Sequence, residues 1–149
     1  MSENSVKTYL QSIRSARMEI DYLSDKVEEL RTSLLPSGIR YDKINVQTSP
    51  DGDQMTDIFC KIENYEGKIK ELLQVLLDDY NGAAEMIMTL EKSEHRQVLW
   101  IYYLDKDRPK WPEVARRMQY SEQRIYQLHN DAITILERAA REKSKQNKD

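Results

Sequence analysis

Cysteine, glycine and proline are scarce in this 149-residue sequence, which contains one Cys, four Gly and four Pro. A single cysteine, Cys60, excludes an internal disulfide framework and a cysteine-rich zinc site. So few turn-forming residues argue against a sheet protein. Apolar residues make up 39% of the chain, below the about 45–50% of an ordinary globular domain. This composition is typical of amphipathic helices that each bury one stripe of side chains.

Long apolar segments are also missing. No apolar run approaches the roughly 18 residues that span a bilayer. The first residues, Met1-Ser2-Glu3-Asn4, lack the basic-then-apolar order of a secretory signal. We therefore expect a cytoplasmic protein that does not associate with a membrane.

The sequence lacks the residue patterns of catalysis and metal binding. It has no glycine-rich phosphate loop, no histidine pair at metal-ligand spacing and no Ser-His-Asp arrangement. The two histidines, His95 and His129, are expected to be solvated or to cap helices, and Cys60 is expected to act as a small hydrophobic residue. The prediction is a protein that is not an enzyme, with no metal and no cofactor.

Charge is distributed unevenly along the chain. Residues 92–149 contain 13 Lys and Arg against 9 Asp and Glu, a balance of +4. Residues 1–91 contain 10 against 17, a balance of −7. The asymmetry indicates a basic C-terminal part that interacts with an anionic partner and an acidic remainder.

Residues 1–35 show the heptad pattern of a coiled-coil helix. Charged residues such as Glu28, Glu29 and Arg31 occur at the other positions, and no Gly or Pro occurs before Pro36. The a positions hold Val6, Ile13, Ile20, Val27 and Leu34, and the d positions hold Tyr9, Ala16, Leu23 and Leu30. Residues 36–52 have no helical period and are expected to form a connector.

Residues 53–91 are predicted to form a second long coiled-coil helix. Its a and d positions are Met55, Ile58, Ile62, Tyr65, Ile69, Leu72 and Leu76, followed after one phase shift by Tyr80, Ala83, Ile87 and Leu90. Gly67 and Gly82 are weak points of this helix. The two helices pair either with each other, as an antiparallel hairpin, or with their copies in a second subunit.

Residues 92–141 are predicted to form three shorter helices. The first begins near Ser93. The second begins at Trp111-Pro112, with the proline in the first turn, and the third follows Ser121, a natural N-cap. Residues 142–149 are polar and are expected to be frayed. The predicted fold is all-α, a long coiled-coil helical hairpin followed by a C-terminal three-helix helix-turn-helix domain.

The last two of these helices have the pattern of a helix-turn-helix whose second helix enters the major groove of DNA. The spacing of the apolar residues in this second helix predicts that one set of polar side chains shares its outward face: Glu122, Gln123, Tyr126, Gln127 and Asn130. Gln and Asn can bond adenine edges, and Arg124 can reach guanine or a phosphate. Further cations can neutralise the phosphate backbone of DNA. The main candidates are Lys110, Arg116 and Arg117, and Lys106 and Arg108 lie nearby in the sequence. Ser121 at the cap completes the candidate DNA-binding set.

Residues 111–133, WPEVARRMQYSEQRIYQLHNDAI, resemble region 4 of bacterial sigma factors. The order is shared: an entry residue, a Glu-aliphatic-Ala helix, a turn, Ser, then an aliphatic reader helix. Val98-Leu99-Trp100-Ile101-Tyr102-Tyr103 resembles the helix that leads into that motif. The chain departs from the family in the turn, where Gln119-Tyr120 replaces the common Gly.

Most of residues 40–137, including the connector stretch YDKINVQTSP at 41–50, is similar to phage and prophage late-transcription regulators of the RinA and ArpU type. This resemblance implies a DNA-binding transcriptional regulator acting in a bacterial host cell. RNA polymerase is a further candidate partner, which a sigma-like tail could bind. The acidic helices would then set a homodimer or a higher homo-oligomer. Two other readings stay open: a DNA-packaging component like a small terminase subunit, and a sigma-like protein-interaction module.

Overall fold

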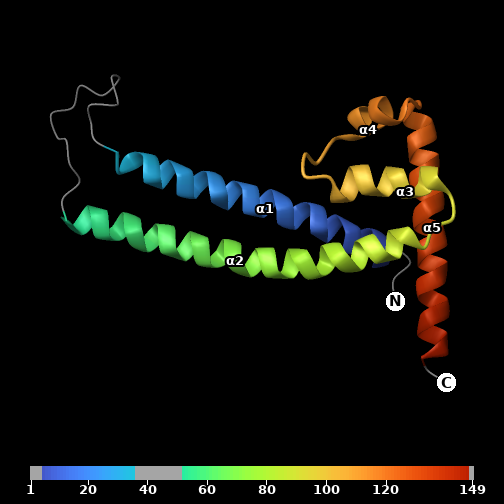
Figure 1. Ribbon diagram of the computed structural model, residues 1–149, viewed down its shortest axis with the longest axis horizontal. Helices are drawn as coiled ribbons and strands as arrows, with labels where there is room; N and C mark the ends of the chain where they lie inside the picture. The colour runs from blue at the N-terminus through green and yellow to red at the C-terminus, as the bar shows by residue number, and fades with distance from the viewer. Residues whose placement is uncertain (1–4, 36–51, 148–149) are drawn as a thin grey trace. The chain divides into compact units, whose positions relative to one another are not determined.

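The computed structural model describes residues 5–35 and 52–147, and every regular element in these ranges is helical (Figure 1). This confirms the predicted all-α class. The elements are α1 (Ser5–Ser33), α2 (Gly52–Met88), α3 (Ser93–Leu99), the π-helical turn η2 (Trp100–Leu104), α4 (Trp111–Met118) and α5 (Glu122–Gln146). The connector stretch 41–50 lies outside the described residues.

The chain forms two compact units. Unit 1 takes in the residues up to Arg17 and those from Leu76 onward, and unit 2 runs from Met18 to Val75. The sequence placed the start of the C-terminal domain at residue 92. The structure adds the first turns of α1 and the last turns of α2 to it, because Leu10, Ile13 and Ile87 are fully buried there.

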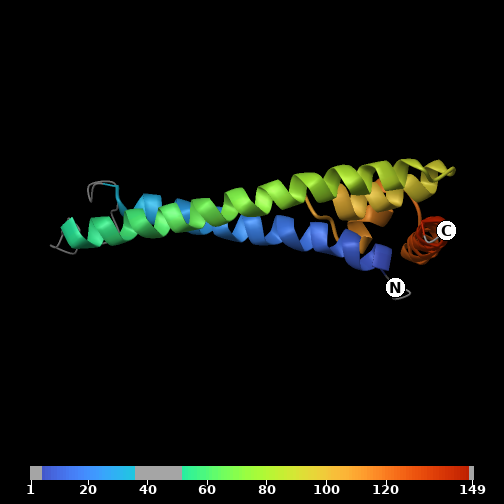
Figure 2. The same ribbon diagram turned by 90° about the horizontal axis from the view of Figure 1, so that it is seen from below.

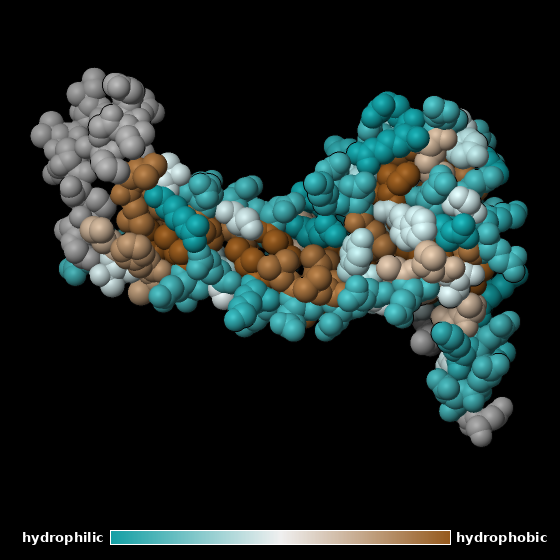
Figure 3. Space-filling view, in the orientation of Figure 1, coloured by the Kyte–Doolittle hydropathy of each residue, from teal (hydrophilic) through white to brown (hydrophobic). Residues whose placement is uncertain are grey.

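Unit 2 consists of two helix segments, residues 18–33 of α1 and 52–75 of α2, which lie side by side and antiparallel in both views (Figures 1 and 2). The Arg31 guanidinium forms an ion pair with Glu66 across them. Hydrophobic side chains gather along this pair between hydrophilic flanks (Figure 3). Val27 and Ile62 are buried, whereas Met55, predicted at an a position, is exposed. Cys60 is also exposed, so its predicted packing role is wrong.

Unit 1 is built around α5, on which α3 and α4 pack. Its fully buried side chains include Val98, Leu99, Tyr103, Val114, Ile125, Leu128 and Leu136. His95 and His129 are buried as well, which corrects the expected solvated or capping role. Both lie on apolar helix faces, three or four residues from Val98 and Leu99 or from Ile125 and Ala132, and they share the burial of those faces.

Gly82 lies where α2 meets α1 within unit 1. A Cβ atom at this position would be 2.8 Å from the Tyr9 hydroxyl oxygen. That hydroxyl donates a hydrogen bond of 2.7 Å to the backbone carbonyl of Asp79. Gly82 therefore makes room for a helix contact, whereas Gly67 has nothing within 4 Å of its added Cβ.

The observed end of α5 differs from the predicted one. We expected the last helix to end near Arg141, but α5 continues to Gln146. Residues 142–146, EKSKQ, contain no Gly or Pro, and Lys143 and Lys145 favour the negative end of the helix dipole. Of the predicted frayed tail, only residues 148–149 lie outside the described residues.

Candidate nucleic-acid interface

Three residues join α4 to α5, and the first of them adopts a left-handed conformation. Gln119 has φ 61° and ψ 38°, a region that glycine usually occupies. The N–H of Tyr120 donates to the carbonyl of Ala115, and the N–H of Gln119 donates to that of Arg116. These two bonds form a Schellman cap, which satisfies carbonyls at the end of α4. The tight turn thus forms with Gln at a position where glycine is usual.

Ser121 caps the start of α5, as the sequence predicted. Its backbone is extended, and its Oγ accepts a hydrogen bond of 3.1 Å from the N–H of Arg124. Glu122 follows in the first turn, where a carboxylate favours the helix dipole. The cap uses one lone pair of Oγ, so Ser121 positions α5 and keeps its O–H donor for a partner.

The polar side chains predicted to face outward from α5 are all exposed: Glu122, Gln123, Tyr126, Gln127 and Asn130. The opposite side of the helix holds Ile125, Leu128 and Ala132, which are buried. Gln123 and Gln127 are four residues apart and therefore neighbours on the surface. The structure brings the predicted base-contacting residues together on one open helix face.

An aromatic cluster packs between the η2 turn, the start of α4 and α5, next to the exposed face of α5. The Trp111 ring stacks on Tyr102 with centroids 3.7 Å apart, which anchors the start of α4 against η2. The Trp111 ring also contacts Tyr126 edge-on at 5.5 Å and His129 at 4.9 Å. Tyr126 is consequently held by the Trp111 ring while 42% of the residue stays exposed.

Arg14 of α1 holds the segment that precedes α4. Its guanidinium lies 4.1 Å from the centre of the Tyr102 ring and donates to the carbonyls of Tyr102 (2.6 Å) and Arg108 (3.0 Å). Arg108 has a positive φ of 50°, so this contact fixes an unusual backbone turn. Sequence reasoning missed Arg14, because nothing in a heptad pattern distinguishes it from other charged residues beside an a position.

The predicted phosphate-contacting cations differ in their environments. Arg116 is 73% exposed and pairs with Glu113, with Nε 2.9 Å from Oε2. Arg117 is only 29% exposed and pairs with three carboxylates, those of Glu113, Asp105 and Asp107. The two guanidinium groups lower the pKa of Glu113 to about 2. Arg117 thus ties α4 to the 105–107 loop.

The remaining cations of the predicted set are more open. Arg124 lies 3.6 Å from the Glu94 carboxylate and 3.4 Å from the Gln127 side-chain oxygen, at an exposed site. Lys110 is exposed, and no carboxylate of the described ranges pairs with it. Lys106 is exposed on the same loop, and Arg108 is half-buried.

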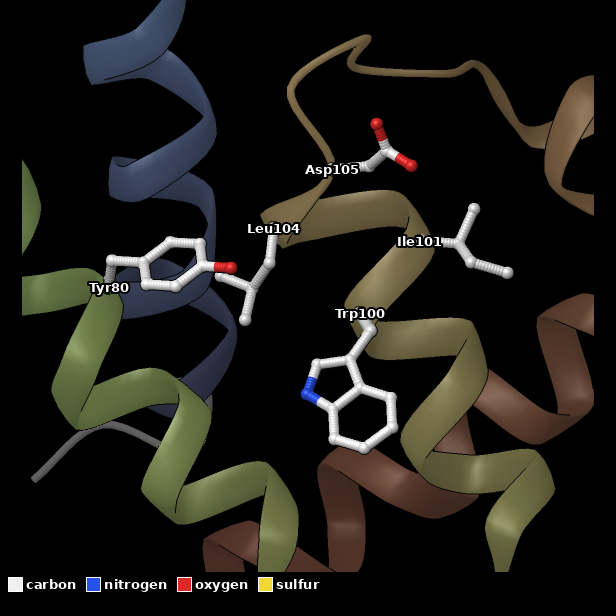
Figure 4. Close-up of a pocket in the computed structure, with 5 residues that line it drawn as sticks. All are labelled: Tyr80, Trp100, Ile101, Leu104 and Asp105. Atoms are coloured by element: carbon white, nitrogen blue, oxygen red, sulfur yellow. The ribbon is translucent and has the colours of Figure 1, made fainter.

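A small open hollow near this loop offers no catalytic arrangement (Figure 4). It has a volume of about 280 Å³ and is lined by Tyr80, Trp100, Ile101, Leu104 and Asp105. The Asp105 carboxylate points away from the two aromatic rings and binds Arg117 and the N–H of Asp107. Within residues 5–35 and 52–147, no group of His, Cys, Asp and Glu side chains is arranged to hold a metal ion.

Comparison with protein-family models, curated proteins and solved structures gives no match to this chain. Among the helices that the structure describes, none has the length and apolar character needed to cross a membrane.

Proposed function

We propose that the protein is a sequence-specific DNA-binding transcriptional regulator of phage or prophage origin, which acts in the bacterial cytoplasm. The observation that carries the proposal is the open face of α5, with Gln123, Gln127 and Asn130 exposed together directly after a three-residue turn. Such a helix fits the major groove, and Gln and Asn amides can bond bidentately to adenine edges. The sigma-like pattern of residues 111–133 supports the same assignment.

Contacts to the phosphate backbone of the DNA would come from cations beside this α5 face. Lys110 precedes α4, and Arg116 projects from the exposed side of α4. Arg116 can exchange Glu113 for a phosphate, because a surface ion pair contributes only about 0–1 kcal/mol. Arg117 also ties α4 to the 105–107 loop, so its removal would loosen that connection as well as remove a candidate phosphate contact.

Unit 2 would bring two copies together. Phe59 and Leu73, 51% and 43% exposed, lie fourteen residues apart on one side of α2, and Met18 and Tyr22 are exposed on α1. Four exposed apolar side chains on one small helix pair are typical of a protein-protein interface. We propose that a second copy of the chain covers them. Changing Phe59 and Leu73 together to Gln is expected to halve the mass measured by light scattering.

The central experiment replaces Gln123 and Gln127 together with Ala. Duplexes selected from random DNA by the wild type serve as specific probes, and a scrambled duplex serves as the non-specific probe. We expect the variant to lose discrimination between them while it keeps its affinity for the scrambled duplex. The matched control changes Gln11 and Gln74, which are exposed on α1 and α2, to Ala and should bind like the wild type.

Three results would contradict the proposed function or favour another one. Unchanged discrimination in the double variant would remove α5 as the base-reading helix. A ring-sized oligomer in solution would favour a packaging component like a small terminase subunit. The absence of any salt-dependent DNA affinity in the wild type would favour a module that binds RNA polymerase or another protein.

A further inference from the structure

The C-terminal half of α5 carries a second set of exposed cations. Residues 134–146 contain four Lys or Arg and two Glu. Glu137 is buried and accepts hydrogen bonds from Ser5 and from the N–H of Val6, which leaves Glu142 as the exposed carboxylate of this stretch. The exposed cations are Arg138, Arg141, Lys143 and Lys145. These turns of α5 form a hydrophilic surface in Figure 3.

Three of these cations continue the face that carries the glutamines. Arg138 follows Gln127 by eleven residues and Lys145 follows Arg138 by seven, separations close to whole helical turns. Arg141 lies beside them, one turn after Arg138. These three cations lie opposite the buried side of α5, which is formed by Ile125, Ala132 and Leu136. One helix face thus begins with amides and ends with cations.

These cations have no carboxylate partner within the described ranges. Arg116, Arg117 and Arg124 each form an ion pair with a side chain of the same unit. No such pair involves Arg138, Arg141 or Lys145 in residues 5–35 and 52–147. Their charge is available to a partner without breaking an internal pair.

The length of α5 places the two sets at different parts of a duplex. At 1.5 Å per residue, Arg138 lies about 17 Å and Lys145 about 27 Å along the axis from Gln127. The major groove is about 12 Å wide, so a helix whose glutamines contact base edges leaves the groove before it reaches these cations. The C-terminal turns then pass over a phosphate strand.

We infer that Arg138, Arg141 and Lys145 form a phosphate-contacting stripe that binds the backbone of the same B-form duplex that α5 reads. The inference depends on the proposed DNA-binding function. It assigns to the C-terminal half of α5 the non-specific part of the affinity, and to the N-terminal half the discrimination between sequences.

The test replaces all three cations with Gln in the full chain. Affinity for a selected duplex and for a scrambled duplex is measured between 50 and 200 mM salt. We expect binding to both duplexes to be weakened alike. The negative slope of log K against log salt should become shallower by about 2.7, which is 0.9 for each lost phosphate contact. The salt-induced loss of affinity over this range would then be about 40-fold smaller than in the wild type.

The matched control changes Lys61, Lys68 and Lys70, which are exposed in unit 2, to Gln and so removes the same net charge. An unchanged slope in the α5 variant, or an equal fall in the control, overturns the inference while the Gln123 and Gln127 experiment still reports on base reading. Altered self-association of the α5 variant with unchanged DNA binding would assign the stripe to the acidic surface of a second copy. A wild type without salt-dependent DNA affinity refutes both proposals.

Discussion

The hydroxyl oxygen of Tyr103 lies 2.6 Å from Nε2 of His129, and the two side chains are almost completely buried. Burial lowers the pKa of His129 to about 4. It also lowers the pKa of His95, on the neighbouring helix α3. The core of unit 1 therefore holds two imidazoles that are neutral in the folded protein at neutral pH.

This burial predicts a loss of stability on mild acidification. The unfolded chain binds a proton at His129 near pH 6.5, whereas the folded chain binds it only near pH 4. The free energy of unfolding should fall as the pH drops from 6.5 to 4, by roughly 3 kcal/mol for this residue. Urea unfolding at several pH values measures it. The variant His129→Gln, which can still bond Tyr103, should show a smaller fall, and equal falls in both proteins would contradict the assignment.

Gly67 and Gly82 of α2 are expected to respond oppositely to alanine. Gly67→Ala should raise stability by about 0.5–1 kcal/mol, because it meets no neighbour and improves helix propensity. Gly82→Ala should lower it, because the new Cβ displaces the Tyr9 hydroxyl from its bond to Asp79. The unfolding temperatures of the two variants, compared with that of the wild type, measure these effects. In a Tyr9→Phe background the second change should become neutral or stabilising, and a persistent loss there would exclude this contact as the cause.

Gln119 is strained in the turn before α5, so Gln119→Gly should stabilise the protein by about 1 kcal/mol. The same substitution at Gln74, exposed inside α2, should cost about 1 kcal/mol. Denaturant midpoints of the two variants would move in opposite directions. A shift of the same sign in both would show that Gln119 is not limited by its backbone conformation.

Glu137 caps the start of α1 from the far end of the chain. Its Oε1 accepts a 2.6 Å hydrogen bond from the N–H of Val6, and its Oε2 accepts from the Ser5 hydroxyl. Glu137→Ala should cost about 1–3 kcal/mol, because it leaves a buried N–H unsatisfied. Glu142→Ala, an exposed control, should change stability by no more than about 0.5 kcal/mol. A similar effect of both substitutions on the unfolding temperature would rule out the cap.

The helices themselves could be predicted from sequence, because their signals are local. Heptad spacing marked α1 and α2, Pro112 marked the start of α4, and the Ser121 cap marked that of α5. The outward set on α5 followed from the same periodicity, since buried residues such as Ile125 and Leu128 determine the opposite face.

The contacts between distant segments could not be predicted. Arg14 reaches Tyr102 and Arg108 across about ninety residues, and no local pattern records such a pairing. Histidine as a residue type predicts solvated side chains, whereas the position of His95 and His129 on apolar helix faces determines their burial. The polar composition of residues 142–146 predicts fraying, but every residue there tolerates a helix, and α5 continues to Gln146.

The contact of Glu137 with Ser5 and Val6 has a consequence during synthesis. A ribosome releases the first turn of α1 long before it translates the residue that caps it. Until then the leading amide groups of the nascent chain must be hydrated, and Leu10 and Ile13, which are buried in unit 1, lack the part of that unit that is still to be translated. Unit 1 can therefore close only after translation has passed position 137, and products of premature termination upstream would carry an incomplete fold.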